Sequence, residues 1–115
     1  MLEQKNPLVL AFVGDAVQTL FVRENLSSAD AKIAALHKSA SQIVCAAAQA
    51  KRFDEIYTTL TDIEKDIANR ARNAQHNTVP KSCTPGEYHK ATALEAVIGY
   101  NYLSGNKERA KEISC

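Results

Sequence analysis

The stretch LAFVGDAVQTLFV, residues 10–22, is largely apolar, yet it carries a glycine and an aspartate side by side near its centre. Inside a helix, a glycine costs about 0.5–1 kcal/mol relative to alanine. A buried, unpaired carboxylate such as that of Asp15 costs several kcal/mol more, unless it pairs, binds a metal or takes up a proton. Because Gly14 and Asp15 both depart from the rules for a buried helix, this segment is a candidate functional site.

The composition around this stretch is that of a folded soluble domain. The chain has 115 residues, of which 45% are hydrophobic and 23% are charged. This length suits one domain with its own core, so we expect a single domain over residues 1–115. The net charge of +1 gives no global argument for nucleic-acid binding, and any such argument must come from a local patch.

Cysteine usage and apolar runs bear on the compartment. The three cysteines, Cys45, Cys83 and Cys115, are widely spaced and form no C-x-x-C pair. We expect them to be free thiols in a reducing compartment, which favours a cytoplasmic location over a disulfide framework or a zinc site. The polar N-terminus and the interrupted apolar run predict no secretion signal and no membrane span.

Local start signals divide the first half of the chain into helices. Asn6 and Pro7 combine a capping side chain with proline at the first helical position, and the apolar run 8–22 follows them. Residues 27–30, Ser-Ser-Ala-Asp, have the pattern of a capping box. We expect them to open a second helical region that breaks near Lys38 and Ser39.

Three further helices have clearer signals. A capping box at residues 61–64 predicts a helix that reaches about Asn73, and a second box at 84–87 predicts one that ends near Gly105. Asn106 can cap a short final helix. No segment shows sustained alternation or a hairpin dipeptide, so no sheet is expected. The sequence therefore predicts an all-α fold, a helical bundle.

A second carboxylate has surroundings similar to those of Asp15. Helical periodicity predicts a mostly buried face around Asp15, made of Leu8, Ala11, Phe12, Thr19 and Val22. In ATALEAVIGYNYL, residues 91–103, Glu95 shares its side of the helix with Ala91, Thr92, Ile98, Gly99 and Tyr102. Small residues let helix backbones approach closely, so the pattern predicts a crossing at Gly14 and Gly99 that brings Asp15 and Glu95 together.

Two carboxylates held close together repel each other, so that one takes up a proton or a cation lies between them. Oxygen ligands that leave positions open suit Mg²⁺ or Mn²⁺, and such a metal can activate water and neutralise charge on a phosphate. Spacing alone leaves other roles open. Asp15 could bond a helix end or pair with an arginine, and Glu95 could face solvent.

The segment NRARNAQHNTVPKS, residues 69–82, is basic and contains no acidic residue. Its cationic and basic side chains are Arg70, Arg72, His76 and Lys81, and Asn73, Asn77 and Thr78 add hydrogen-bonding groups. Phosphate contacts need this composition, and the lack of aromatic residues favours a duplex backbone over a splayed single strand. A solvated charged loop is the alternative. The pair His37 and Lys38 is a smaller basic feature, and the roles of His37, His76 and His89 stay open.

Together these segments resemble one family. LAFVGDAVQTLFVRE resembles the signature helix of ribonuclease III catalytic domains, and ALEAVIGYNYLSGN resembles the second signature of that family. NPLVLAFVGDAV, LHKSAS, RARNAQHNTVPK and ATALEAVIGYNYLSGN are similar to the short bacterial subfamily, Mini-ribonuclease III, which has the catalytic domain without a double-stranded RNA-binding domain. The resemblance covers residues 6–106.

The resemblance implies an all-helical ribonuclease III-type endonuclease domain that forms a homodimer and hydrolyses double-stranded RNA with Mg²⁺, which Mn²⁺ can replace. Asp15 and Glu95 match the catalytic, metal-binding aspartate and glutamate of the family. The residues expected to hold the RNA backbone are Arg70, Arg72, Asn73, Thr78 and Lys81. The short subfamily is associated with trimming large-subunit (23S) ribosomal RNA precursors, which makes that RNA, and a ribosomal protein with it, candidate partners.

The chain also departs from the family pattern. Full-length relatives carry two further acids, one turn before each matched carboxylate, where this chain and the short subfamily do not; Ala11 and Thr92 stand at those places. Ala71 replaces a glycine of the basic loop, with an open effect on loop geometry. Two alternatives to an enzyme are a non-catalytic module that binds structured RNA in ribosome assembly and a structural helical domain.

Overall fold

The computed structural model describes residues 1–74 and 78–115. Its helices are α1 (Pro7–Leu26), α2 (Ile33–Val44), α3 (Ala46–Ile56), α4 (Asp62–Asn73), α5 (Pro85–Leu103) and α6 (Lys107–Ser114), with short 3₁₀ turns η1 (Leu2–Gln4) and η2 (Tyr57–Thr59). These ranges contain no strand, which confirms the predicted all-α fold. None of the helices so described has the length and hydropathy needed to cross a bilayer.

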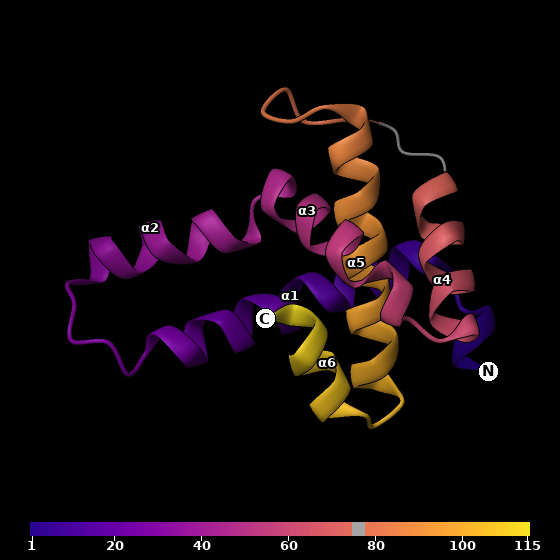
Figure 1. The fold of residues 1–115 in the computed structure, drawn as a ribbon, viewed down its shortest axis with the longest axis horizontal. Coiled ribbons are helices and arrows are strands. Elements are labelled where there is room, and N and C mark those ends of the chain that lie inside the picture. The colour runs from indigo at the N-terminus through magenta and orange to yellow at the C-terminus, as the bar shows by residue number, and fades with distance from the viewer. Residues whose placement is uncertain (75–77) are drawn as a thin grey trace.

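Helix α5 is the centre of the molecule (Figure 1). It packs against α1, α3, α4 and α6, and α1 crosses it near the middle of both helices. Buried side chains lie on every side of α5, so this helix is apolar almost all round, as a helix enclosed by neighbours must be. The C-terminal half of α1 and all of α2 extend side by side as an arm away from this centre.

Four helices begin at the capping residues that the sequence predicts. Asn6 accepts a hydrogen bond from the Leu8 amide at 2.9 Å, and Pro7 is the first residue of α1. Thr61 and Thr84 each form a complete capping box, at the starts of α4 and α5. Asn106 caps α6. These caps satisfy amides that have no partner within the helix, which is why so local a signal is reliable.

Two predictions for the second helical region are wrong: where it begins and where it breaks. The hydroxyls of Ser27 and Ser28 donate back to the carbonyls of Glu24 and Asn25, at 2.6 and 3.2 Å. They therefore finish α1 instead of opening α2, which begins only at Ile33 and has no side-chain cap. The break falls at Cys45, where ψ is 155°, and not at Lys38 and Ser39. It lies there because α2 packs along α1 whereas α3 packs on α5.

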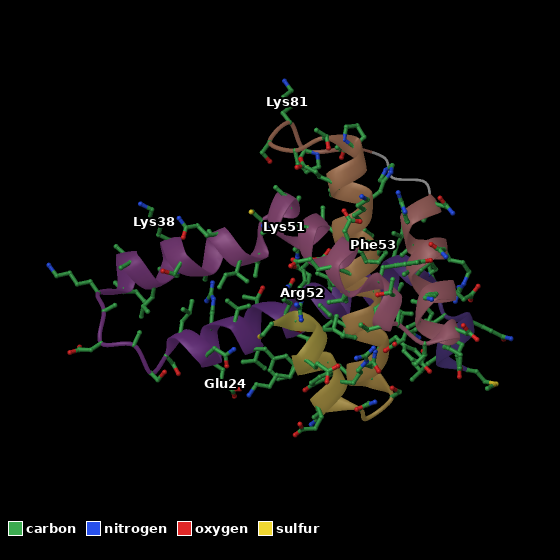
Figure 2. The ribbon with its side chains drawn as sticks, viewed as in Figure 1. Glu24, Lys38, Lys51, Arg52, Phe53 and Lys81 are labelled. Atoms are coloured by element: carbon green, nitrogen blue, oxygen red, sulfur yellow. The ribbon has the colours of Figure 1, made fainter. Side chains whose placement is uncertain are left out.

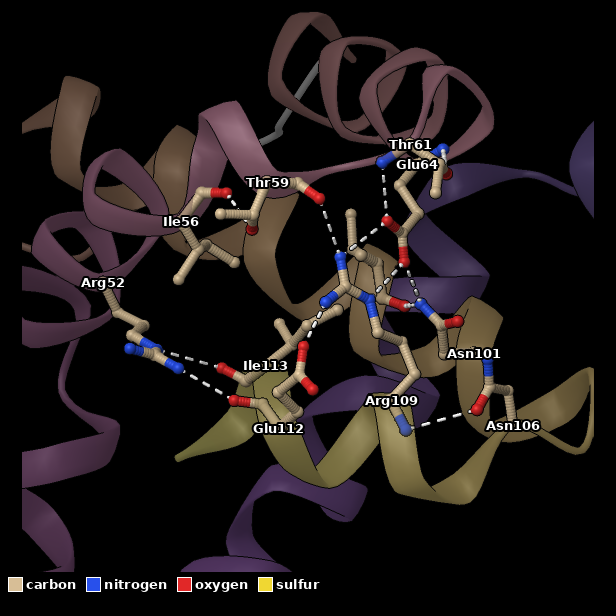
Figure 3. Close-up of polar contacts among 11 residues, drawn as sticks. Arg52, Ile56, Thr59, Thr61, Glu64, Asn101, Asn106, Arg109, Glu112 and Ile113 are labelled. Atoms are coloured by element: carbon tan, nitrogen blue, oxygen red, sulfur yellow. Dashed lines mark hydrogen bonds and ion pairs between the residues drawn. The ribbon is translucent and has the colours of Figure 1, made fainter.

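A buried ion pair fixes α4 and α6 to α5 (Figure 3). The Glu64 side chain, 3% exposed, accepts hydrogen bonds from the Arg109 guanidinium at 3.0 and 3.1 Å and from the Asn101 amide at 2.8 Å. Burial raises the pKa of Glu64, but the hydrogen bonds from Arg109, Thr61 and Asn101 outweigh it and lower the pKa below its ordinary value. This carboxylate is fully partnered, and its role is structural.

Candidate functional site

The site is built on the direct contact between the backbones of α1 and α5. A methyl group placed on Gly14 would overlap the carbonyl oxygen of Glu95 and lie 2.9 Å from the amide nitrogen of Gly99. A methyl group placed on Gly99 would overlap the carbonyl oxygen of Leu10 and lie 3.0 Å from the amide nitrogen of Gly14. The predicted crossing at these two glycines is confirmed, and no other residue fits at either position.

The crossing brings the Asp15 and Glu95 carboxyl groups together. Glu95 is half-buried and Asp15 is exposed, so the pair lies at the edge of the core and opens to solvent. Burial raises the pKa of Glu95, and the Asp15 carboxylate, which accepts a hydrogen bond from the protonated Glu95 carboxyl and carries a negative charge, raises it further, to about 8. The pair therefore retains a proton at neutral pH, or ionises fully when a cation neutralises it.

The predicted burial is correct for the Glu95 face and only partly correct for the Asp15 face. Ala91, Thr92, Ile98 and Gly99 are buried beside Glu95. On α1, however, Phe12 is 80% exposed. The reason is the crossing itself, since the buried stripe of α1 is centred on Leu10, Gly14 and Val17, and Asp15 lies beside that stripe.

Two glutamines in the same region were not predicted from the sequence. Gln49 of α3 is 4% exposed and its Nε2 donates to Glu95 Oε2 at 3.3 Å and to Gln18 Oε1 at 2.7 Å. Gln18 of α1 is 2% exposed and its Nε2 donates to the carbonyl oxygen of Ser114 at 3.2 Å. A signal was present in the sequence, because Gln49 is the one polar residue in AAAQA, residues 46–50.

The arrangement suits a hard divalent cation. Two carboxylates supply oxygen ligands and leave other coordination positions open to water and substrate oxygens, as Mg²⁺ prefers. Within the part of the chain that the structure describes, no three or more His, Cys, Asp or Glu side chains gather as a metal cluster. Ala11 and Thr92, which lie one turn before Asp15 and Glu95, are both buried, and the Thr92 hydroxyl donates to the Tyr88 carbonyl at 2.9 Å.

The basic residues lie at the end of α4 and beyond it. Arg72 and Asn73 are exposed in the last turn of α4, and Thr78 and Lys81 are exposed in the segment that leads to α5. Figure 2 shows Lys81 at the outer end of this segment, pointing away from the helices. Glu95 lies about 15 Å along α5 from its first residue, at the ordinary helical rise. His76 lies outside the described residues.

Arg70 and Ala71 both lie in the last turn of α4. Arg70 Nε pairs with Asp66 at 3.0 Å, and its Nη2 donates to the carbonyl of Glu3, so this side chain connects α4 to the N-terminal turn. Ala71 is fully buried within α4 and has no positive φ, so alanine needs no unusual backbone conformation there. His37 borders a cavity of about 140 Å³ between α1 and α2, and the His89 ring lies 6.2 Å from that of Tyr88.

Comparison with known proteins gives consistent matches over nearly the whole chain. A family model for the ribonuclease III domain matches residues 8–106. Mini-ribonuclease 3 of Thermoanaerobacter sp. (strain X514) is 44% identical over 109 residues, 94% of this chain and 77% of that protein. Mini-ribonuclease 3 of Symbiobacterium thermophilum is 42% identical over 108 residues, 93% of this chain and 83% of that protein. A crystal structure of a Fusobacterium nucleatum protein has a TM-score of 0.89 at 38% identity, covering 96% of this chain and 89% of that one.

Proposed function

Since the chain belongs to the ribonuclease III family, we propose that it is a metal-dependent endoribonuclease that hydrolyses phosphodiester bonds in double-stranded RNA. One observation carries the proposal: the glycine crossing holds Asp15 and Glu95 together at the solvent-facing edge of the core. Two carboxylates that share a proton at neutral pH unless a counter-charge is present are a costly arrangement, and a bound divalent cation supplies that counter-charge. All 115 residues form one catalytic domain in this proposal.

Asp15 and Glu95 would hold Mg²⁺, or Mn²⁺ in its place. When bound, such an ion supplies an activated water and neutralises charge on the phosphate under attack. The carboxylates of the chain bind and orient, and their positions come from two helix backbones in contact. Rigid placement of this kind is what positions a reactive group to within a fraction of an ångström.

We propose that the exposed end of α4 and the following segment bind the phosphate backbone of the duplex. Arg72, Asn73, Thr78 and Lys81 present donors to solvent there, and the partly exposed Arg70 guanidinium borders them. Phosphate contacts release counterions, so binding through this surface weakens as salt rises. A basic patch on a chain of net charge +1 makes the affinity depend on few residues.

This surface predicts a specific salt dependence. Arg72→Ala is expected to weaken binding to duplex RNA and to lower the slope of log K against log salt by about 1, the loss of one phosphate contact. Gel shifts or fluorescence anisotropy in EDTA, from low to high salt, measure both quantities. Lys107→Ala, at the start of α6, is the matched control and should leave the slope unchanged. Equal slopes for wild type and Arg72→Ala would exclude the assignment.

We propose that the enzyme acts as a homodimer on precursors of large-subunit (23S) ribosomal RNA in the cytoplasm, with a ribosomal protein as a further partner. Val9, Phe12 and Leu20 form an exposed apolar stripe on α1, and a second copy of the chain would cover it. The free thiols Cys45, Cys83 and Cys115 suit a reducing compartment. The relatives from Thermoanaerobacter and Symbiobacterium that match over most of this chain are Mini-ribonuclease 3 proteins.

The test is cleavage of a long, end-labelled RNA duplex with Mg²⁺ or with EDTA. We expect cutting with Mg²⁺ only, products with 5′-phosphate and 3′-hydroxyl ends, and no cutting of either single strand or of the matching DNA duplex. An intact duplex that shifts on a gel would instead favour a non-catalytic RNA-binding module. An intact duplex with no shift, with the ribosomal RNA precursor also uncut, would overturn the proposal.

A further inference from the structure

We propose that Gln49 is a positioning residue for Glu95, and that Gln18 anchors Gln49 to the C-terminal end of α6. The inference rests on the proposed function, in which Glu95 holds the metal ion. It concerns three contacts: Gln49 Nε2 to Glu95 Oε2 at 3.3 Å, Gln49 Nε2 to Gln18 Oε1 at 2.7 Å, and Gln18 Nε2 to the Ser114 carbonyl at 3.2 Å.

The direction of the hydrogen bonds in this chain of contacts is fixed by the acceptors at its two ends, the Ser114 carbonyl and the Glu95 carboxyl group. The Ser114 carbonyl can only accept, so Gln18 must turn its NH₂ group toward α6 and its oxygen toward Gln49. Gln49 must then donate to Gln18, and its second N–H is free to donate to Glu95. Neither amide can flip without setting two donors or two acceptors against each other. The orientation of Gln49 is therefore determined by the fold, and not by the charge on Glu95.

Burial makes the arrangement stiff. Both glutamine side chains are almost inaccessible to water, and they join α3, α1 and α6 behind the site. Ser114 is the last residue of α6, so its carbonyl has no partner within that helix and gains one from Gln18. A broken link would leave a buried polar group unsatisfied, which costs about 1–3 kcal/mol.

The consequence for Glu95 is a fixed carboxylate. Gln49 donates to Oε2 from the α3 side, which restrains rotation of the carboxyl group. Partners that hydrogen-bond to a metal ligand orient it, and their loss typically costs about 10–100-fold in metal affinity or activity. Asp15, which is exposed, has no such support from α3 in this arrangement.

The test compares Gln49→Met with Arg52→Met. Methionine keeps the length of Gln49 but cannot donate to Glu95. Arg52 also connects α3 to α6, through the carbonyls of Ile113 and Glu112 at 3.3 and 2.8 Å, without contacting Glu95. Manganese binding to the RNA-free protein is measured by the electron paramagnetic resonance of free Mn²⁺. The Mg²⁺ concentration for half-maximal cleavage and the KM for duplex RNA are measured alongside.

We expect Gln49→Met to weaken Mn²⁺ binding and to raise the half-maximal Mg²⁺ concentration by about 10–100-fold, with KM for RNA unchanged. Arg52→Met should change neither metal quantity. Gln18→Met leaves Gln49 in place without its anchor and should shift both quantities in the same direction by less. It also serves as the test if Gln49→Met does not fold. Wild-type metal affinity in both glutamine variants, or an equal loss in Arg52→Met, would overturn the inference. Failure of the wild type to cleave RNA would overturn the proposed function instead.

Discussion

Replacing Glu95 by glutamine, or Asp15 by asparagine, is expected to reduce cleavage of duplex RNA by at least about a thousandfold at saturating Mg²⁺. Each change keeps the shape of the side chain but removes an anionic ligand from a pair that has no third carboxylate among the described neighbours. Duplex binding in EDTA should stay within about twofold of wild type, because the proposed RNA surface lies at the end of α4. Single-turnover cleavage and anisotropy measure the two effects separately.

The same substitution has a pH signature in the metal-free protein. The pKa of Glu95 rises from its ordinary value of 4.5 to about 8 on folding, so the folded chain holds a proton that the unfolded chain releases between these values. The free energy of unfolding therefore falls as pH rises from about 4.5 to 8, and levels off above that. Glu95→Gln should remove this slope, and in EDTA at pH 8.5 it should unfold at a higher temperature than wild type.

Thermal unfolding in EDTA at pH 5 and pH 8.5 checks this expectation. Glu55→Gln, an exposed position on α3, is the matched control and should keep the wild-type slope. A wild-type protein that gains stability between these pH values, with Glu95→Gln behaving identically, would contradict the burial argument. Added Mg²⁺ should stabilise the wild type at pH 8.5 and have little effect on Glu95→Gln, because the ion neutralises the pair that burial penalises.

Gly14→Ala and Gly99→Ala are each expected to destabilise the protein by more than about 4 kcal/mol, enough to unfold a domain of this size. The added methyl group would overlap the carbonyl oxygen of Glu95 in the first case and that of Leu10 in the second. Backbone atoms in the middle of a helix cannot move aside as a flexible side chain can. The two central helices would have to separate, and the core beside them would open.

Gly86→Ala is the matched control for this prediction. It lies in the first turn of α5, where an added methyl group would meet only the Thr84 hydroxyl oxygen, at 4.0 Å. There alanine should be neutral or slightly stabilising, since glycine is the poorer helix former. Urea denaturation followed by circular dichroism compares the three variants. A cooperative transition near the wild-type midpoint for Gly14→Ala would show that the two backbones are not in contact.

The sequence was informative where a structural signal is local or where steric limits are strict. The capping boxes at Thr61 and Thr84 and the cap at Asn106 satisfy amides within three residues, so their patterns are readable directly. Gly14 and Gly99 were recognisable because each stands in an apolar helix beside or near an acid. The distant pairing of these two helices then followed from one steric argument.

Features that depend on tertiary packing were harder to predict. Ser27 and Ser28 could cap the next helix or finish the previous one, and only the path of α2 along α1 decides between these roles. The exposure of Asp15 depends on which stripe of α1 meets α5. Periodicity alone placed Asp15 on a mostly buried face, whereas in the structure it lies beside the buried stripe and is exposed. Gln18 and Gln49 acquire their partners only when three helices assemble.

The glycine crossing also determines how the site can diversify. Where side chains separate two helices, each exchange of a larger for a smaller residue changes the distance between the helix axes. The separation of catalytic groups carried by the two helices then changes as well. Here atoms of the main chain are in contact, so the separation is set by van der Waals radii that no substitution in the surrounding core alters. Core residues around the crossing can therefore change while the backbones that carry Asp15 and Glu95 keep their spacing.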